Sequence, residues 1–478
     1  MRDDGANSGP ELLLTLRRGA GAPALGIQVE DGLREAIRAG RLRSGDRLPP
    51  SRTLAHDLAV ARRTVVGAYE QLVAEGWLEA RTGSGTFVRR ALPGLAVPAS
   101  AAVVPAAPEA PAGPGRLRYH FFPGHPDLSA FPRAEWGRAV RAALRDLPDS
   151  AFGYGDPRGH RELRVALAGH LARTRGVVCR PRQIVICQGA VQALALLVRS
   201  HAERGAPRVV VEDPYLPEHR DVLAHAGADV VPVPVDGLGI RDESLVAARP
   251  DIALVTPAHQ CPTGVVLAAG RRAAICRWAQ ESTALVVEDD YDAEYRYDRA
   301  PVAAVQSLAP DQVAYLGSTS KTLAPGIRLA WLVVPEDRLE RVVAAKRYAD
   351  AGSPVLEQAA LARLITSGAY DRHVRAARRR QRERRDALVA AVGEHLPDAR
   401  IEGAAAGLHA VVRLARPVGA RELVAAARER EVGVHPLSEY RADPSPETTG
   451  VVLGYGALAV PAVREGVRRL AAALSEVG

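Results

Sequence analysis

The stretch "STSKTLAPGIR" places a lysine in a chain that otherwise relies on arginine. Of its 63 lysine and arginine residues, Lys321 and Lys346 are the lysines. A lysine can lose its proton and attack a carbonyl carbon, whereas an arginine stays protonated. The hydroxyls of Ser318 and Ser320 and the guanidinium of Arg328 lie close to Lys321 in sequence and are suited to an anion. The pattern predicts an amine nucleophile beside an anion site.

Two other segments carry groups that suit the same chemistry. "ICQGAVQAL" puts Gly189 and Ala190 at the start of a helix, where free N–H groups and the helix dipole favour a phosphate. "VVEDDYD" puts Asp289 and Asp290 at a strand end with Tyr291 beside them. Neighbouring strand residues point to opposite faces, so only one of the two carboxylates can face a site. The residues alone leave open whether it is Asp289 or Asp290.

Together these groups meet the requirements of pyridoxal phosphate. The cofactor needs a phosphate cradle, a lysine that forms a Schiff base, and a carboxylate that keeps the pyridine nitrogen protonated. Lys321 is the expected Schiff-base lysine. Lys346, in "VVAAKRYAD", is expected to be an exposed helix residue without a chemical role.

The segment from Tyr119 onward must position these groups. Near-continuous Val, Ile and Leu runs alternate with helical segments, which indicates a mainly parallel sheet covered on both faces. Ligands bind such sheets at the carboxyl ends of the strands. The fold class is therefore α/β, with the candidate site at that edge.

The first 90 residues have a different pattern. Apolar spacing predicts helices over 28–40, 49–60 and 63–76, and two strands around a Gly-rich turn over 77–90. Two short helices joined by a tight turn form a helix-turn-helix, and the strands form a wing. Eight of the arginines lie between Arg34 and Arg63, which suits a DNA-binding surface.

A stretch of Ala, Pro, Gly and Val separates this head from the body and predicts an extended tether. The expected domains are 1–90, a linker over 91–118, and 119–478, with a smaller α+β subdomain from about 380 to 478. The run over 371–388 is strongly basic, and we expect it to be a solvated helix face, with a second DNA-binding surface as the alternative.

Composition agrees with a globular protein of several structural units. The chain has 478 residues, 47% hydrophobic and 25% charged, with a net charge of +8. It has no apolar run long enough for a membrane span and no signal-peptide core, so we expect a cytoplasmic protein. Its four cysteines show no metal-binding spacing and are expected to be reduced and structural.

The head resembles the GntR-type winged-helix regulators through "GRLRSGDRLPPSRTLAHDLAVARRTVVGAYEQLVAEGWLEARTGSGTFV". The resemblance implies that the head binds double-stranded DNA. The residues it assigns to DNA are Arg52, Arg62, Arg63 and Thr64, with Gly85 and Thr86 at the wing tip.

The body resembles fold-type I aminotransferases, and more narrowly the aminotransferase-like domain of MocR regulators. The motifs are "FFPGHPDLSAFPRAEW", "GYGDPRGHRELRVALAGHLARTRGV", "TPAHQCPTG" and "EDDYDAEYRY". The resemblance implies that Lys321 carries pyridoxal phosphate, Asp289 pairs with the ring nitrogen and Tyr291 donates to the ring oxygen. The phosphate ligands it implies are Gly189, Ala190, Ser318, Ser320 and Arg328. It also implies a homodimer in which Tyr154 reaches the cofactor of the neighbouring subunit.

Three positions depart from the aminotransferase pattern. Cys261 replaces an asparagine that bonds the ring oxygen, and Gln260 or His259 is a candidate replacement. Tyr215, the candidate ring-stacking aromatic, lies one position earlier than usual. Val452 lies near the place of the arginine that clamps the substrate carboxylate.

Without that clamp, amino-acid recognition is weakened, and Arg441 and Arg220 are candidates to compensate. The sequence is thus identified as a MocR-type transcriptional regulator with weak or absent transaminase activity. Its expected effector is pyridoxal phosphate itself or an amine or amino acid. The alternative is an aminotransferase with a fused DNA-binding head.

Overall fold

The computed structural model describes residues 14–19, 21–89, 117–201, 205–292, 294–298, 302–403 and 405–477. Contacts divide the chain into two units, Met1–Gly113 and Pro114–Gly478, which are described separately. Nearly all of the linker expected over 91–118 lies outside the described residues, so its limits stay a prediction.

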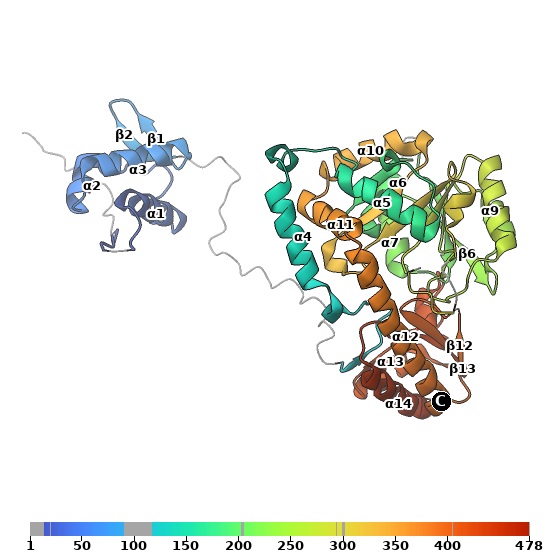
Figure 1. Cartoon of the computed structure of the whole chain (residues 1–478). Coiled ribbons are helices and arrows are strands. Elements are labelled where there is room, and N and C mark those ends of the chain that lie inside the picture. The colour runs from blue at the N-terminus through green and yellow to red at the C-terminus, as the bar shows by residue number, and fades with distance from the viewer. Residues whose placement is uncertain are drawn as a thin grey trace, which may run out of the picture. The chain divides into compact units, whose positions relative to one another are not determined.

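Within its described residues, the head contains three helices and a two-stranded sheet (Figure 1). They are α1 (Leu25–Arg38), α2 (Ser51–Asp57), α3 (Arg62–Ala74), β1 (Leu78–Arg81) and β2 (Gly85–Val88). Val29, Leu33, Val65 and Leu72 are fully buried in a common core, which the helical spacing of these residues predicted. The Tyr69 hydroxyl donates to the Pro49 carbonyl at 2.8 Å and ties α3 to the segment before α2. The predicted winged helix is confirmed.

The wing tip lies elsewhere than the sequence suggested. Gly85 and Thr86 pair with Arg81 and Ala80 as the first residues of β2. The turn itself is formed by residues 82–84. Gly83 has a φ of 76°, a value that glycine adopts readily.

The large domain of the body is built around an eight-stranded sheet with helices on both faces (Figure 1). Its strands are β4 (Ile184–Cys187), β5 (Arg208–Asp213), β6 (Asp229–Asp236), β7 (Gly239–Ile240), β8 (Ile252–Val255), β9 (Leu285–Asp289), β10 (Val313–Ser318) and β11 (Ala330–Val333). Its helices are α4 (Arg133–Asp146), α5 (Arg161–Arg175), α6 (Ala190–Arg199), α7 (Pro217–His225), α8 (Asp242–Ala248), α9 (Ala269–Glu281), α10 (Glu336–Asp350), α11 (Val355–Thr366) and α12 (Ala369–His395).

The strand order is β4-β11-β10-β9-β8-β5-β6-β7. β10, β9, β8, β5 and β6 pair in parallel, and β11 runs antiparallel between β10 and β4. β4 therefore has the same direction as β10, and the carboxyl ends of β4, β5, β8, β9 and β10 share one edge. The predicted mainly parallel sheet is confirmed.

The strands β4, β8 and β11 are apolar and buried on both sides because both faces of the sheet are covered. Val185 and Cys187 of β4 pack with α6, α7 and α10, whereas Ile184 and Ile186 pack with α5 and α11. The fully buried strand thus reads as a continuous apolar run in the sequence.

The small domain packs helices on an antiparallel sheet. Its elements are β12 (Arg400–Glu402), β13 (His409–Gly419), α13 (Ala420–Glu429), β14 (Val432–Gly433), β15 (His435–Pro436), β16 (Glu447–Gly454) and α14 (Val460–Val477). The structure adds β3 (Tyr119–His120), which pairs in parallel with β14. Tyr119 and Phe121 lie in the small-domain core. α12 runs from the large domain into this core (Figure 1).

Two expectations about basic residues need correction. Lys346 on α10 is fully buried and not exposed. The run over 371–388 is not uniformly solvated: Arg378 Nε donates to the Glu294 carbonyl at 2.5 Å, and Arg384 Nη2 donates to Asp127 Oδ2 at 2.6 Å.

Within the described residues, no helix is long and apolar enough to cross a bilayer.

Candidate functional site

Lys321 lies in the turn that follows β10, at the edge where the parallel strands end. Its Nζ donates to the Gly124 carbonyl at 2.7 Å, and its own carbonyl accepts from the Tyr295 hydroxyl at 2.9 Å. Burial lowers the pKa of the Lys321 amine. A lower pKa increases the fraction of Lys321 that is in the neutral, nucleophilic form at a given pH.

The anion cradle is assembled from residues that follow β4, from the end of β10 and from Arg328, two residues before β11. Gly189 precedes α6 with a φ of 97° and no side-chain cap, so the first N–H groups of α6, from Ala190 on, are free of a capping side chain. Arg328 Nη2 donates to the Gln188 carbonyl at 2.5 Å. A Cβ on Gly189 would lie 2.9 Å from that same nitrogen, and the φ of 97° is one that glycine adopts readily.

The serines complete this cradle. Ser318 is the last residue of β10, and its Oγ accepts from the backbone N–H of Ser320 at 3.3 Å. Together with the guanidinium of Arg328 and the amino end of α6, this donor set fits a phosphate group.

The two adjacent aspartates have separate environments. Asp290 forms a two-pronged ion pair with Arg175, at 2.6 and 3.0 Å, and accepts from the Tyr315 hydroxyl at 2.6 Å. Asp289 instead accepts from the Tyr215 hydroxyl at 3.2 Å, and His219 Nδ1 lies 3.8 Å away. The environment of Asp290 is structural, which leaves Asp289 as the carboxylate available to the site.

Burial sets the ionisation of the Asp289 cluster. It raises the pKa of Asp289 to about 7, against the lowering effect of the Tyr215 hydrogen bond. Burial, with the nearby charge of Lys321, lowers the pKa of His219 to about 4. Burial also raises the pKa of Tyr215 well above its ordinary value. His219 is therefore a neutral partner of Asp289 near pH 7.

Tyr291 and His259 form a second cluster. His259 Nδ1 lies 3.0 Å from the Tyr291 hydroxyl and 3.1 Å from Asp292 Oδ2. His259 thus orients Tyr291. Cys261, which stands at the position of the usual asparagine, is buried, and burial raises its thiol pKa.

Gln260 is held inside the protein. Its Nε2 donates to the Pro214 carbonyl at 2.8 Å and to Glu212 Oε2 at 3.2 Å, and its Oε1 accepts from the Thr263 hydroxyl at 2.6 Å. With 1% of its surface exposed, Gln260 has no free donor for a ring oxygen. It supports the loop, and we do not retain it as a cofactor ligand.

The position near Val452 is apolar. Val452 is fully buried with Val411, Leu437 and Tyr440, and Leu216 packs against this cluster. Because a carboxylate loses hydration in such surroundings, the cluster offers it no stabilisation.

The two candidate replacements for the missing arginine differ. Arg441 is half exposed, and its Nη1 lies 3.8 Å from Asp213 Oδ2. Arg220 on α7 has a buried Nη1 without a hydrogen-bond partner among the described residues. Neither forms a described contact with Lys321 or Asp289.

Tyr154 does not reach the site of its own chain. It is 99% exposed, between a short 3-10 turn (Asp149–Phe152) and α5. Three residues of the site, Gly124, Tyr295 and His219, were not predicted from the sequence. Only the folded topology brings Gly124, which lies 197 positions away in sequence, to Lys321.

The candidate DNA surface lies on α2 and α3. Arg52, Arg62 and Arg63 are exposed in the first turns of these helices, and Thr64 is partly buried. Arg62 Nε lies 3.4 Å from Ser51 Oγ, which brings the two helix starts together. Exposed arginines at a helix start can reach base edges or phosphates.

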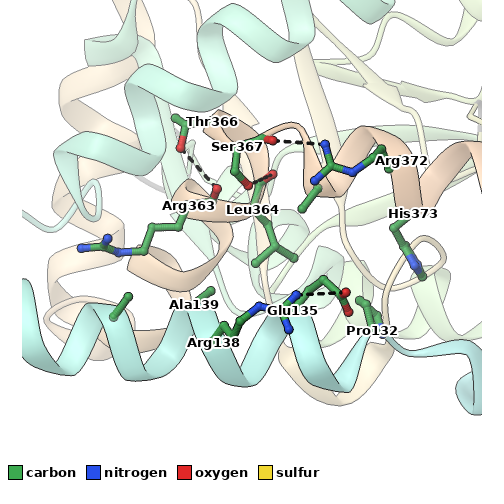
Figure 2. Close-up of a pocket in the computed structure, with 12 residues that line it drawn as sticks. Pro132, Glu135, Arg138, Ala139, Arg363, Leu364, Thr366, Ser367, Arg372 and His373 are labelled. Carbon is green, nitrogen blue, oxygen red and sulfur yellow. Dashed lines mark hydrogen bonds and ion pairs between the residues drawn. The ribbon is translucent and has the colours of Figure 1, made fainter.

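A separate cavity of about 730 Å³ lies between α4, α11 and α12 (Figure 2). Figure 2 shows Arg363 and Arg372 at opposite ends of it. Arg363 pairs with Asp146 at 3.1 Å, and Arg138 pairs with Glu135 at 3.2 Å. Because Arg363 and Arg138 already have acidic partners, we assign no ligand to this cavity.

Comparisons with known proteins match both parts of the chain. Residues 25–88 match the gntR family of bacterial regulatory proteins, and residues 132–449 match the family of class I and II aminotransferases. The probable rhizopine catabolism regulatory protein MocR of Rhizobium meliloti is 36% identical and covers 96% of each chain. The HTH-type pyridoxine biosynthesis transcriptional regulator PdxR of Corynebacterium glutamicum is 34% identical, covering 90% of this chain and 91% of its own.

A solved structure resembles the body alone. That of LysN, an alpha-aminoadipate aminotransferase from Thermus thermophilus complexed with N-(5'-phosphopyridoxyl)-L-leucine, has a TM-score of 0.68. It is 27% identical and covers 76% of this chain and 96% of that chain.

The two aspartates should respond differently to substitution. Asp290→Asn leaves the buried Arg175 guanidinium without its counter-charge, so we expect a loss of about 3–5 kcal/mol in the free energy of unfolding of the body. Denaturant unfolding, followed by circular dichroism, measures it.

Asp289→Asn is the matched control. Burial raises the pKa of Asp289 to about 7. Above that pH the carboxylate is ionised in the folded protein, and its burial lowers the free energy of unfolding by the full amount. Below the ordinary aspartate pKa the group is protonated in both the folded and the unfolded state, and this loss disappears. The amide removes this cost, so Asp289→Asn should stabilise the cofactor-free body most above pH 7. A loss as large as that for Asp290→Asn would contradict the separate roles.

Proposed function

The chain belongs to the MocR-type transcriptional regulators, and we propose that its body binds pyridoxal phosphate at Lys321 and that occupancy of this site controls DNA binding by the head. The observation that carries the proposal is the position of the Lys321 amine. It is held by the Gly124 carbonyl at the strand edge that also bears Asp289 and the cradle around Gly189.

The residues divide by the part of the cofactor that they would hold. Asp289 would pair with the ring nitrogen, and Tyr291, oriented by His259, would donate to the ring oxygen. Tyr215 supports Asp289 through its hydroxyl. The phosphate would be held by Gly189, Ala190, Ser318, Ser320 and Arg328. When bound, pyridoxal phosphate supplies an electrophilic carbonyl carbon and an electron-withdrawing ring.

The site offers fewer groups for binding a substrate carboxylate than for binding the cofactor. The apolar cluster around Val452 lacks a bidentate partner for a carboxylate. We therefore propose weak or absent transamination, and an effector that is either pyridoxal phosphate itself or an amine that competes with Lys321. The second candidate function, an aminotransferase with a fused head, is favoured by Lys321, Asp289 and the groups suited to the cofactor phosphate, and by the similarity to LysN.

A homodimer is part of the proposal. Tyr154 is 99% exposed and free to contact a second copy of the chain. A dimer presents two heads, which suits two half-sites on DNA.

Lys321 should be the residue that carries the cofactor. Borohydride reduction of cofactor-saturated protein, followed by peptide mapping, should place a pyridoxyl group on Lys321, because its amine is in the site and its pKa is lowered. Lys346 is the internal control, since it is the other lysine. A pyridoxyl group on Lys346, or none at all, would refute the assignment.

Arg62 and Arg63 of α3 should contribute to DNA binding but not to cofactor binding. Arg62→Ala and Arg63→Ala should each weaken binding to the DNA upstream of the protein's own gene, by about 1–3 kcal/mol if the side chain reads a base. Cofactor affinity should not change. Arg468→Ala, an exposed arginine of the small domain, is the charge-matched control. Equal DNA affinity of all three variants and the wild type over a range of salt concentrations would count against this surface.

The regulatory proposal is tested by comparing three states. DNA affinity is measured for cofactor-free protein, for protein loaded with pyridoxal phosphate, and for loaded protein with candidate amines. At least two states should differ, by about 1–3 kcal/mol, because an effector can switch DNA binding only through such a coupling free energy. Identical affinities together with rapid amino-acid turnover would favour the aminotransferase instead.

A further inference from the structure

The second lysine of the chain, Lys346, lies in the protein interior, where lysine is rarely found. Lys346 lies on α10 with none of its surface exposed. Buried charges are costly unless they are paired and hydrogen-bonded. A lysine here, in a chain that otherwise uses arginine, requires a specific set of partners.

Three acceptors surround its ammonium group. Lys346 Nζ donates to Asp350 Oδ2 at 2.5 Å, to Ser353 Oγ at 2.8 Å and to Gln192 Oε1 at 3.1 Å. An ammonium has three donors on one compact atom, whereas a guanidinium spreads five over a plane. The site therefore fits lysine and not arginine.

Gln192 connects this lysine to the anion cradle. It lies in the first turn of α6, and its Oε1 also accepts from the backbone N–H of Gln188 at 2.8 Å. Its Nε2 donates to Asp350 at 2.8 Å. Both ends of the Gln192 amide are thus fixed by the Lys346–Asp350 pair, with its oxygen directed at the Gln188 backbone.

The Gln188 peptide then leads directly to the cradle. Its carbonyl accepts from Arg328 Nη2, its side chain donates to Asp350 at 3.2 Å, and the next residue is Gly189. The orientation of this backbone determines where the first N–H groups of α6 and the Arg328 guanidinium point. A hydrogen-bonded path therefore runs from Lys346 through Gln192 to both phosphate-binding elements.

We propose that Lys346 is a positioning residue for the anion cradle: through Gln192 it fixes the Gln188 and Gly189 backbone so that α6 and Arg328 can hold the cofactor phosphate. The proposal rests on the proposed binding of pyridoxal phosphate by the body. Lys346 itself does not touch the cofactor.

The test separates positioning from general stability by comparing two ligands. Pyridoxal 5'-phosphate and pyridoxal share the ring and the carbonyl carbon, but only the former has a phosphate. Affinities of both are measured by absorbance for the wild type, Gln192→Met, Lys346→Met and Lys346→Arg. Gln192→Met is the most specific variant, because it removes the link through Gln192 while the Lys346–Asp350 ion pair and the Gln188–Asp350 hydrogen bond stay in place.

The preference for the phosphorylated ligand should fall about tenfold or more in Gln192→Met and in both Lys346 variants, since oriented hydrogen bonds to a charged group are lost. Affinity for pyridoxal should stay nearly constant. Thr448→Val, which removes a buried hydroxyl in the small domain, should leave the preference unchanged.

Two results would overturn the proposal. If Gln192→Met folds and keeps the wild-type preference, the path does not position the cradle. If both affinities fall equally in the variants, Lys346 acts on stability alone. A wild type without any preference for the phosphorylated ligand would instead contradict the proposed function, so the two failures are distinguishable.

Discussion

The parallel register of the large sheet is the constraint on which the candidate site depends. β9 and β10 pair in parallel with Leu316 opposite Asp289, and β11 pairs Ala330 with both Ser318 and Cys187. This register brings the ends of β4, β9 and β10 to one edge. A slip of one residue would turn every side chain to the other face, and the carboxylate, the lysine turn and the cradle would no longer converge.

Successive side chains of a strand point to opposite faces of the sheet, which explains why the adjacent carboxylates of Asp289 and Asp290 have different partners. The ion pair with Arg175 holds Asp290 on one side, which leaves Asp289 with Tyr215 and His219 on the other. The proposed site therefore depends on a buried ion pair that takes no part in the chemistry. The apolar surroundings of Val452 restrict what can be recognised next to the cofactor, and this favours a sensor over a transaminase.

Much of this arrangement could be predicted from the sequence. Helical spacing in the head, continuous apolar runs in the body and the residue types at three strand ends are local signals. The contacts made by single side chains were less predictable. Gln260 has a suitable amide, but its partners come from Glu212, Pro214 and Thr263, and only the fold brings them together. Lys346 was expected to be an exposed helix residue, yet it is fully buried and hydrogen-bonded to Gln192 and Asp350.

The central claim, that the Lys321 site and the DNA-binding head are coupled, is tested most directly from the cofactor side. Coupling free energies are reciprocal, so DNA must alter the affinity of the body for its ligand if the ligand alters the affinity for DNA. Pyridoxal phosphate is titrated into the purified protein, with absorbance as the readout, in the presence and absence of DNA from upstream of its own gene. The account predicts dissociation constants that differ severalfold, whereas identical constants at saturating DNA would contradict it.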